Sequence, residues 1–384
     1  MEYKGTIKSK LPKAGTTIFT IMSALANECG AINLSQGFPN FPVSSELIDL
    51  IHQKMKDGHN QYAPMPGILP LRERIAEKIQ DLYSAKYNPE TEITITSGGT
   101  QAIYTAITAI IREGDEVIVF EPAYDCYAPA IELSGGIPVS LHLKHPDFHI
   151  DWDEVKKMVN KKTRMIMINT PHNPCGSVLT AKDMHELEKI TSGTNIIILS
   201  DEVYEHVIFD GHEHQSVTRY PELAEKSFAV FSFGKTYHAT GWKMGYIVAP
   251  EKLMTKFRRV HQFNVFASNT PIQHALAEFM SEKKHYEGLN KFYQSKRDYF
   301  LKLMNGSRFR PLPCSGSYFQ LFDYSEISNE KDTEFAKRIT KEFKVASIPV
   351  SVFYKNPPEE KILRFCFAKD DETLKAAAEK LKEV

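Results

Sequence analysis

Short apolar runs alternate with helix-like stretches through the middle of this 384-residue chain. The apolar runs lie at 93–96, 116–120, 164–170, 195–201, 227–233 and 245–250, and the helical stretches lie at 98–112, 127–134, 151–160 and 181–191. This alternation is typical of an α/β fold with a mostly parallel sheet that helices cover on both faces. Ligands of such sheets bind beyond the carboxyl ends of the strands, so we expect functional residues in the loops that follow the strands.

The ends of the chain predict a second, smaller domain. Outside the alternating region, helices are expected at about 18–26, from 44 or 45 to about 55, and after a rigid Pro- and Gly-rich loop at 64–70. A further helical region is expected from 271 to 304, with or without a break. From about 308, three strand candidates (SYFQLF, VASIPV and ILRFCF) and a closing helix indicate an α+β unit. We therefore place a large domain at 44–285, and a small domain at 286–384 together with 1–43, which includes an N-terminal arm.

Composition restricts the partners and the compartment. A formal net charge of −1 favours neither nucleic acid nor an anionic membrane as a partner. No apolar run is long enough to span a bilayer, and the polar, basic N-terminus does not resemble a secretory signal. Five cysteines without CxxC spacing argue against a disulfide framework and against a zinc site. We therefore expect a cytoplasmic protein without a bound metal.

The segment 232–246, SFGKTYHATGWKMGY, contains the most informative chemistry. Lys235 lies in a glycine-containing turn, and a lysine amine is the group that pyridoxal phosphate uses to attach covalently to proteins. Ser232, Lys243 and the backbone of this segment could donate hydrogen bonds to the phosphate of that cofactor. The alternative is a surface loop with two solvated lysines.

Two further loops contain residues that suit the same cofactor. In SGGTQA, Gly99 and Thr100 begin a predicted helix, where backbone N–H groups bind phosphate, although such junctions also serve as plain turns. In LSDEVYEHV, Asp201 ends a predicted strand and could keep a pyridine nitrogen protonated, while Tyr204 could bond the phenolic oxygen O3′. Alternatively, Asp201 caps a helix and Tyr204 lies on its surface.

Three more residues have both a functional and a structural interpretation. Asn173, in an Asn-Pro turn, either bonds O3′ or only forms the turn. Tyr124 follows a predicted strand and either stacks on the cofactor ring or fills the core. Arg364 lies in an apolar run, where its planar guanidinium either binds a substrate carboxylate or points from an edge strand into solvent.

The combination of NPxG, DEVYE and SFGKTYxxTGWKxGY resembles the class I/II, fold type I pyridoxal-phosphate aminotransferases. The resemblance covers nearly the whole chain, from GAINLSQGFPNFP to the strand with Arg364. The branch of methionine aminotransferases and kynurenine/glutamine transaminases is the most similar, because the chain contains TTIFTIMSALA, NQYAPMPG and EPAYDCYAPA. This family has a large domain with a seven-stranded sheet and a smaller α+β domain.

The resemblance implies a role for each candidate residue. Lys235 would form the Schiff base and transfer the proton, Asp201 would pair with the pyridine nitrogen, and Tyr124 would stack on the ring. The residues implied in the remaining contacts are Asn173 and Tyr204 at O3′, Gly99, Thr100, Ser232 and Lys243 at the phosphate, Arg364 with Gly37 and Asn173 at the substrate carboxylate, and Ile18 and Phe38 in the substrate pocket. Many relatives have arginine where this chain has Lys243, which loses the bidentate contact with phosphate.

The resemblance also implies a homodimer with shared active sites. Tyr62 matches a tyrosine that reaches the phosphate of the neighbouring subunit's cofactor, and the segment 261–273 falls where relatives approach the partner's site.

The implied reaction moves an amino group from an amino acid to a 2-oxo acid by a ping-pong mechanism. Pocket candidates are apolar or aromatic (Ile18, Phe19, Phe38, Tyr62 and Tyr124), so uncharged donors such as methionine, aromatic amino acids, glutamine or kynurenine are expected. Four arginines elsewhere, at 72, 74, 164 and 219, leave an acidic donor open. Two alternative functions are a cysteine-S-conjugate β-lyase that uses the same site and a cofactor-binding regulator without catalysis.

Overall fold

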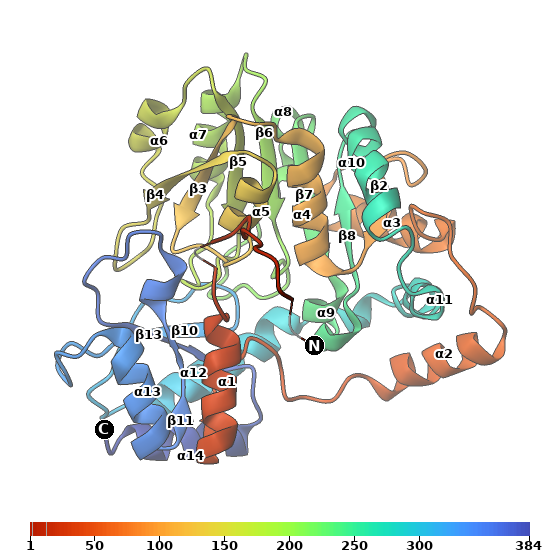
Figure 1. The fold of residues 1–384 in the computed structure, drawn as a ribbon. Coiled ribbons are helices and arrows are strands. Elements are labelled where there is room, and N and C mark those ends of the chain that lie inside the picture. Colours follow the sequence, from red (N-terminus) through yellow and green to blue (C-terminus); the bar gives the residue numbers. More distant parts are fainter. Residues whose placement is uncertain (2, 13) are drawn as a thin grey trace.

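A seven-stranded sheet forms the centre of the computed structural model, which describes residues 1, 3–12 and 14–384 (Figure 1). Its strands, in the order β2-β8-β7-β6-β5-β3-β4, are β2 (Ile93–Thr96), β8 (Gly245–Val248), β7 (Ser227–Ser232), β6 (Ile197–Asp201), β5 (Thr163–Asn169), β3 (Glu116–Glu121) and β4 (Ile137–His142). Strand β8 pairs antiparallel with β2 and β7, and the other neighbours pair in parallel. The predicted mostly parallel α/β sheet is therefore confirmed.

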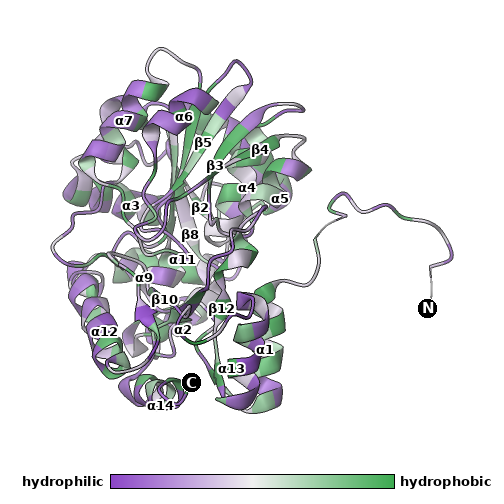
Figure 2. Cartoon of the chain, turned by 90° about the vertical axis from the view of Figure 1, so that its left-hand side faces the viewer, coloured by the Kyte–Doolittle hydropathy of each residue, from purple (hydrophilic) through white to green (hydrophobic). Residues whose placement is uncertain are grey.

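Helices cover both faces of this sheet because the strands are apolar on both sides. Along β5, Ile166 and Ile168 belong to one buried cluster and Met165 and Met167 to another, as the twofold alternation of a strand requires. The first face is covered by α3 (Leu69–Tyr83), α6 (Trp152–Met158), α7 (Ala181–Thr191) and α11 (Thr270–Phe279). The second face is covered by α4 (Gly98–Ile110), α5 (Tyr127–Leu133) and α10 (Glu251–Asn264). Figure 2 shows the contrast between the hydrophobic strands and the largely hydrophilic outer surfaces of α6 and α7.

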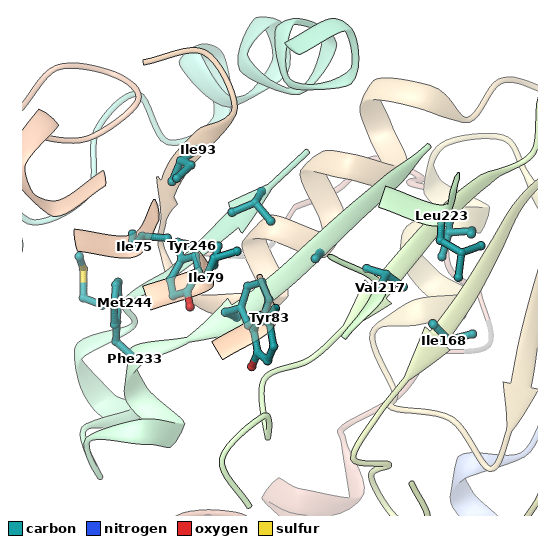
Figure 3. Packing of buried hydrophobic residues seen from close by; sticks show 14 of the residues in the cluster. Ile75, Ile79, Tyr83, Ile93, Ile168, Val217, Leu223, Phe233, Met244 and Tyr246 are labelled. Atoms are coloured by element: carbon teal, nitrogen blue, oxygen red, sulfur yellow. The ribbon is translucent and has the colours of Figure 1, made fainter. Parts of the chain in front are cut away.

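Helix α3 shows how the sequence positions these covering helices. It begins at Leu69 with a proline in its first turn, and it ends before Ser84, which adopts a left-handed conformation. Ile75, Ile79 and Tyr83 recur at intervals of four residues and pack toward Tyr246 of β8 (Figure 3). Burial of each such side chain contributes roughly 1.5–3 kcal/mol.

A smaller unit lies below the large sheet in Figure 1. Its antiparallel sheet has the order β12-β13-β10-β9, with β12 (Ile348–Pro349), β13 (Ile362–Cys366), β10 (Phe319–Asp323) and β9 (Arg310–Pro311). A parallel pair, β1 (Ile32–Asn33) with β11 (Val345–Ala346), joins the N-terminal segment to this unit. Its helices are α1 (Ile18–Cys29), α12 (Leu289–Met304), α13 (Asp332–Glu342) and α14 (Asp371–Leu381).

The small unit has its own core. One buried cluster joins Met22 of α1, Phe300 of α12, Phe335 of α13 and Leu374 of α14, so the two ends of the chain pack together. Helix α11 belongs to the core of the large sheet, whereas α12 belongs to this one. The predicted boundaries at 43/44 and 285/286 remain a prediction.

Several elements were not predicted, among them β4, α10, α13 and the short strands β1 and β9, and one prediction is refined. Strand β4 was missed because it lies at the sheet edge and is only partly buried. Helix α10 was missed although its buried residues Met254, Phe257 and His261 follow helical spacing. The helical region predicted at 271–304 consists of α11 and α12, with a 3-10 turn at Lys283–His285 between them.

The remaining helical elements are α2 (Ser45–Lys56), α8 (Pro221–Ala224), α9 (Phe233–Thr236) and the 3-10 turns Val217–Arg219, Thr240–Trp242 and Val350–Phe353. Among the helices of the described residues, none combines the length and the apolar character that a membrane span needs.

Candidate active site

A cavity of about 310 Å³ lies between the large sheet and the small unit, at the carboxyl ends of β5, β6 and β7. Its volume is within the range of small-molecule sites. The sequence-predicted residues that line it are Phe19, Gly37, Gly99, Thr100, Tyr124, Asn173, Asp201, Tyr204, Ser232, Lys235, Lys243 and Arg364. Residues as far apart in the chain as Phe19 and Arg364 therefore meet in one cavity.

Lys235 enters the cavity from α9, the short helix that follows β7. Ser232 caps this helix, because its Oγ accepts a hydrogen bond from the backbone N–H of Lys235 at 3.3 Å. The Lys235 Nζ donates to the carbonyl of Gly37 at 3.0 Å and to the hydroxyl of Tyr318 at 2.8 Å. Burial lowers the pKa of Lys235 to about 8, so a minor fraction of the amine, roughly a tenth at pH 7, is neutral, far more than for a free lysine.

Asp201 ends β6 and is 4% exposed. Its carboxylate accepts a hydrogen bond from the hydroxyl of Tyr127 at 2.6 Å and another from the backbone N–H of Val203 at 3.3 Å. Burial raises the pKa of Asp201 to about 6, while these two hydrogen bonds act in the opposite direction. A carboxylate that is buried in this way is suited to a cationic partner such as a protonated pyridine nitrogen.

We expect Tyr127→Phe to weaken the site through Asp201. The variant removes a hydrogen bond to a buried carboxylate, which costs about 1–3 kcal/mol, and it should raise the pKa of Asp201 further. The expected result is a lower melting temperature together with a loss of activity at mildly acidic pH. Thermal unfolding and a pH–rate profile check both expectations. Unchanged values in both experiments would show that the Tyr127 contact has no energetic role.

The N-terminus of α4 forms the other side of the cavity and suits a phosphate. The helix begins at Gly98, where φ is +80°, and the side chain of Ser97 does not cap its first backbone N–H groups. A Cβ atom at Gly99 would lie only 2.9 Å from Val203, so a larger residue would not fit there. A Cβ atom at Gly98 would lie 3.6 Å from the Lys243 Nζ, which places this cation beside the start of the helix. The residues present therefore fit the phosphate group of pyridoxal phosphate.

Arg364 forms the opposite wall, on β13, and is 1% exposed. Its guanidinium donates to the Asn173 Oδ1 at 2.8 Å and to the carbonyl of Ser35 at 3.0 Å, and it stacks 3.9 Å from the ring centre of Phe319. Its buried Nε has no hydrogen-bond partner among the described residues. Burial lowers the pKa of Arg364 to about 10, so the group remains cationic at neutral pH. A buried cation without a carboxylate partner in the described chain is suited to binding a substrate carboxylate.

Three sequence-predicted residues do not line the cavity of the single chain. Tyr62 is 84% exposed and contacts the ring of Phe266, with 5.4 Å between ring centres. Phe38 is half-exposed beside the ammonium group of Lys369. Ile18 begins α1 and packs against the core of the small unit. Their roles in the site remain predictions, and the role of Tyr62 requires a second subunit.

Some residues in the cavity lining or in contact with it were not predicted as site residues. Tyr127 and Tyr318 contact Asp201 and Lys235 directly, and Asn169 donates from its side chain to the Asp201 carbonyl at 2.8 Å. Tyr127 lies three residues after Tyr124 and begins α5, so its place in EPAYDCY was an available signal. Tyr318 follows the sequence Ser-Gly-Ser at 315–317 and precedes an apolar strand, and this context does not distinguish it from a core tyrosine.

The match to known families decides the identity of the chain. The model of the family described as "Aminotransferase class I and II" matches residues 30–381. The chain belongs to this aminotransferase family. It is therefore a transaminase that depends on pyridoxal phosphate, which confirms the predicted family, fold and cofactor.

Individual relatives of this aminotransferase cover nearly its whole length. It is 49% identical over 378 residues to the methionine aminotransferase of Escherichia coli (strain K12), which covers 98% of each chain. A crystal structure of an Escherichia coli protein identified as a methionine aminotransferase matches with a TM-score of 0.97 at 48% identity, over 99% of this chain and 100% of that one. The kynurenine–oxoglutarate transaminase 1 of Homo sapiens is 31% identical over 394 residues, or 94% of this chain and 93% of that protein.

Proposed function

We propose that this aminotransferase takes the amino group of methionine or an aromatic amino acid, with glutamine and kynurenine as further candidates, and transfers it to a 2-oxo acid. The supporting observation is the set of cations in the cavity. Among the lining residues these are Lys235, Lys243 and Arg364, and each has a role that leaves no cation for an acidic substrate side chain. The names of the two relatives, a methionine aminotransferase and a kynurenine–oxoglutarate transaminase, also favour uncharged donors.

Lys235, Asp201 and Arg364 have separate roles in the reaction. Bound pyridoxal phosphate supplies a ring that withdraws electrons from the α-carbon of the amino acid. Lys235 attaches the cofactor, and its Nζ then removes the α-proton and returns it during product formation. Asp201 holds the pyridine nitrogen in its cationic form, and Arg364 fixes the substrate carboxylate. The proposed ping-pong sequence uses these same side chains in both directions.

The remaining residues would hold the cofactor in place. Asn173 and Tyr204 would orient O3′, and Tyr124 would stack on the ring and exclude water from it. The Tyr124 hydroxyl lies 3.4 Å from Thr100 Oγ1, which keeps the tyrosine beside the phosphate region. The phosphate would be bound by Gly99, Thr100, Ser232 and Lys243. The loop that contains Gly37 would lie beside the substrate carboxylate.

The four arginines that could have bound the side chain of an acidic amino donor make contacts outside the cavity. Arg72 donates to the backbone carbonyls of Gly67 and Pro89, and Arg74 pairs with Glu77 on the surface. Arg164 lies 3.8 Å from Asp115, and Arg219 pairs with Glu213 at 3.0 Å. Since none of these arginines lines the cavity, an acidic side chain would lose its hydration in the site without a compensating charge.

A homodimer with shared sites is also part of the proposal. Tyr62 is 84% exposed, Phe263 is 87% exposed and Phe266 is half-exposed, which is unusual for large aromatic residues on a free surface. Phe263 and Phe266 belong to the segment 261–273 that was predicted to approach the partner. A second copy of the chain would bury these rings and bring Tyr62 to the cofactor phosphate. A cytoplasmic location is consistent with five free cysteines.

The test is a comparison of amino donors with one 2-oxo acid acceptor. We expect kcat/KM for methionine, phenylalanine and kynurenine to exceed that for aspartate by about 10-fold to 100-fold, because aspartate would bury an unpaired carboxylate. Equal or better use of aspartate would contradict the proposed substrate class. Release of pyruvate and ammonia from a cysteine conjugate without a 2-oxo acid would instead indicate the β-lyase alternative, which the names of the relatives do not favour.

A further inference from the structure

The hydroxyl of Tyr318 joins the amine of Lys235 to the loop that contains Gly37. Tyr318 precedes β10, is fully buried, and donates its hydroxyl hydrogen to the Gly37 carbonyl at 2.6 Å. The Lys235 Nζ donates to the Tyr318 oxygen at 2.8 Å and to the same Gly37 carbonyl at 3.0 Å. These three groups form a closed triangle at one end of the cavity.

The directions of these hydrogen bonds are fixed by chemistry. A phenol has one hydrogen, and that of Tyr318 is used on Gly37, so its oxygen can only accept from Lys235. A neutral lysine amine has two hydrogens, and the two acceptors use both of them. Its lone pair then remains uncommitted, which is the condition for accepting a proton from a substrate carbon.

Packing leaves the Tyr318 ring little freedom to turn away. Its ring centre lies 5.0 Å from Tyr204, 5.0 Å from Phe319 and 5.7 Å from Tyr293. The pKa of Tyr318 is raised well above the usual value by burial and by nearby Tyr204, so the hydroxyl stays protonated and keeps its bond to Gly37.

The position of the Gly37 carbonyl is also fixed by packing and by hydrogen bonds of its neighbours. A Cβ atom at Gly37 would lie 2.8 Å from the Phe319 ring, so this close approach requires glycine. The neighbouring carbonyls of Ser35 and Phe38 accept hydrogen bonds from Arg364 at 3.0 Å and from Lys369 at 2.8 Å. The acceptor that faces Lys235 therefore belongs to a segment that the small unit holds in place.

We propose that Tyr318 is a positioning residue of the transamination reaction, which holds the free amine of Lys235 against Gly37 with its lone pair available for proton transfer. This inference rests on the role proposed for Lys235. When the cofactor is not attached to Lys235, the triangle gives the side chain one defined place beside the substrate and prevents it from moving among several rotamers. The triangle also links the large unit, which carries Lys235, to the small unit, which carries Tyr318.

The test compares Tyr318→Phe with Tyr293→Phe. Tyr293 is a matched control, because it is a buried tyrosine next to Tyr318 whose hydroxyl has no hydrogen-bond partner among the described residues. We expect Tyr318→Phe to lower kcat by about 10-fold to 100-fold with less than about a threefold change in KM, whereas Tyr293→Phe should resemble the wild type. Equal kinetics in the two variants would overturn the proposal.

A second readout follows the amine itself. In the pyridoxamine phosphate form of the holoenzyme, where Lys235 is not covalently attached, a small acylating reagent and peptide mass spectrometry measure its reactivity at several pH values. Loss of the Tyr318 acceptor destabilises the ammonium form more than the neutral form, so the neutral fraction below the pKa should rise about threefold to tenfold. The charged and titratable groups that face Lys235 in both variants are Asp201, Tyr204, Lys243, Arg364 and Cys366. Faster acylation together with slower turnover supports the proposal, and unchanged acylation contradicts it.

Two further measurements distinguish failure of the proposed function from failure of the role proposed for Tyr318. Borohydride reduction of the holoenzyme followed by peptide mapping shows whether Lys235 attaches the cofactor, and attachment elsewhere would contradict the proposed function rather than the role of Tyr318. If Tyr318→Phe does not fold, 3-fluorotyrosine at position 318 keeps the ring and the hydroxyl but weakens the acceptor. Acylation that is faster than in the wild type is then expected, and the same rate as in the wild type would overturn the proposal.

Discussion

Lys235→Met is expected to abolish transamination, with a loss of at least about 10⁴-fold in kcat. The variant removes the amine that attaches the cofactor and transfers the α-proton, and methionine fills a similar volume. Its neighbours remain satisfied, because Tyr318 still donates to the Gly37 carbonyl. The measurements are turnover with methionine as the donor and the mass of the borohydride-reduced protein. Substantial activity, or cofactor still linked to the peptide with position 235 replaced, would contradict the role of Lys235.

The same variant should change the stability of the cofactor-free protein in a pH-dependent way. The pKa of Lys235 is about 8 in the folded chain and about 10.5 in a free lysine, so between these values the unfolded chain binds more protons. Wild-type stability therefore rises from pH 8 to pH 10.5, and Lys235→Met lacks this rise. At pH 7 the variant should be more stable, by of the order of 3 kcal/mol, and the difference should shrink as the pH is raised.

Denaturant unfolding at pH 7 and pH 10 checks this expectation. Lys161→Met, at an exposed lysine, is the control for the loss of a lysine side chain, and its effect on the free energy of unfolding should stay within about 0.5 kcal/mol. A difference between Lys235→Met and the wild type that stays constant from pH 7 to pH 10 would show that burial does not lower the pKa of Lys235.

Asp201→Asn is expected to lower kcat by about 10²-fold to 10³-fold while the cofactor still attaches to Lys235. The amide keeps the shape of the side chain and an acceptor for the Tyr127 hydroxyl, but it removes the negative charge at the end of β6. Without that charge the pyridine nitrogen has no counter-ion and loses its proton more easily, so the ring withdraws electrons less well. Turnover and the visible spectrum of the bound cofactor are measured together.

Asp332→Asn is the matched control for this substitution. Asp332 is also 4% exposed, but it lies in the small unit, where it accepts hydrogen bonds from the backbone N–H and the hydroxyl of Ser351. Its amide variant should lose stability and keep kcat per folded molecule. If Asp201→Asn also kept its kcat, the proposed pairing of Asp201 with the cofactor nitrogen would be wrong.

The parts of the site that could be predicted are those where a polar residue or a glycine comes at or shortly after the end of an apolar strand. Lys235, Asp201 and Asn173 each follow an apolar strand, and the parallel pairing of β5, β6 and β7 brings the ends of these strands to one edge of the sheet. Gly99 could be predicted because it stands beside Gly98 at a strand-to-helix junction, where the structure shows a positive φ at Gly98 and a close approach of Val203 to Gly99. The sequence therefore predicted the cofactor side of the cavity from elements that are close in the chain.

The side of the cavity contributed by the small unit was harder to predict. Gly37, Tyr318 and Arg364 come from three distant segments, and the pairing of β10 with β13 decides which side chains face the cavity. Gly37 entered only through the family resemblance, whereas Arg364 was proposed from its place in an apolar run, with a solvent-facing position left open. The direction of the Tyr318 hydroxyl depends on the rings packed around it, and no pattern in SYFQLF encodes that direction. The same limit applies to Tyr62, whose predicted contact is with another subunit.

The most direct measurement of the central claim is the absorbance spectrum of the purified protein during the two half-reactions. We predict a visible band from bound pyridoxal phosphate that disappears when methionine is added and returns when a 2-oxo acid is added. Aspartate at the same concentration should convert the band much more slowly. A band that no amino acid changes, or no band even after pyridoxal phosphate is supplied, would contradict the assignment of this cavity as the site of transamination.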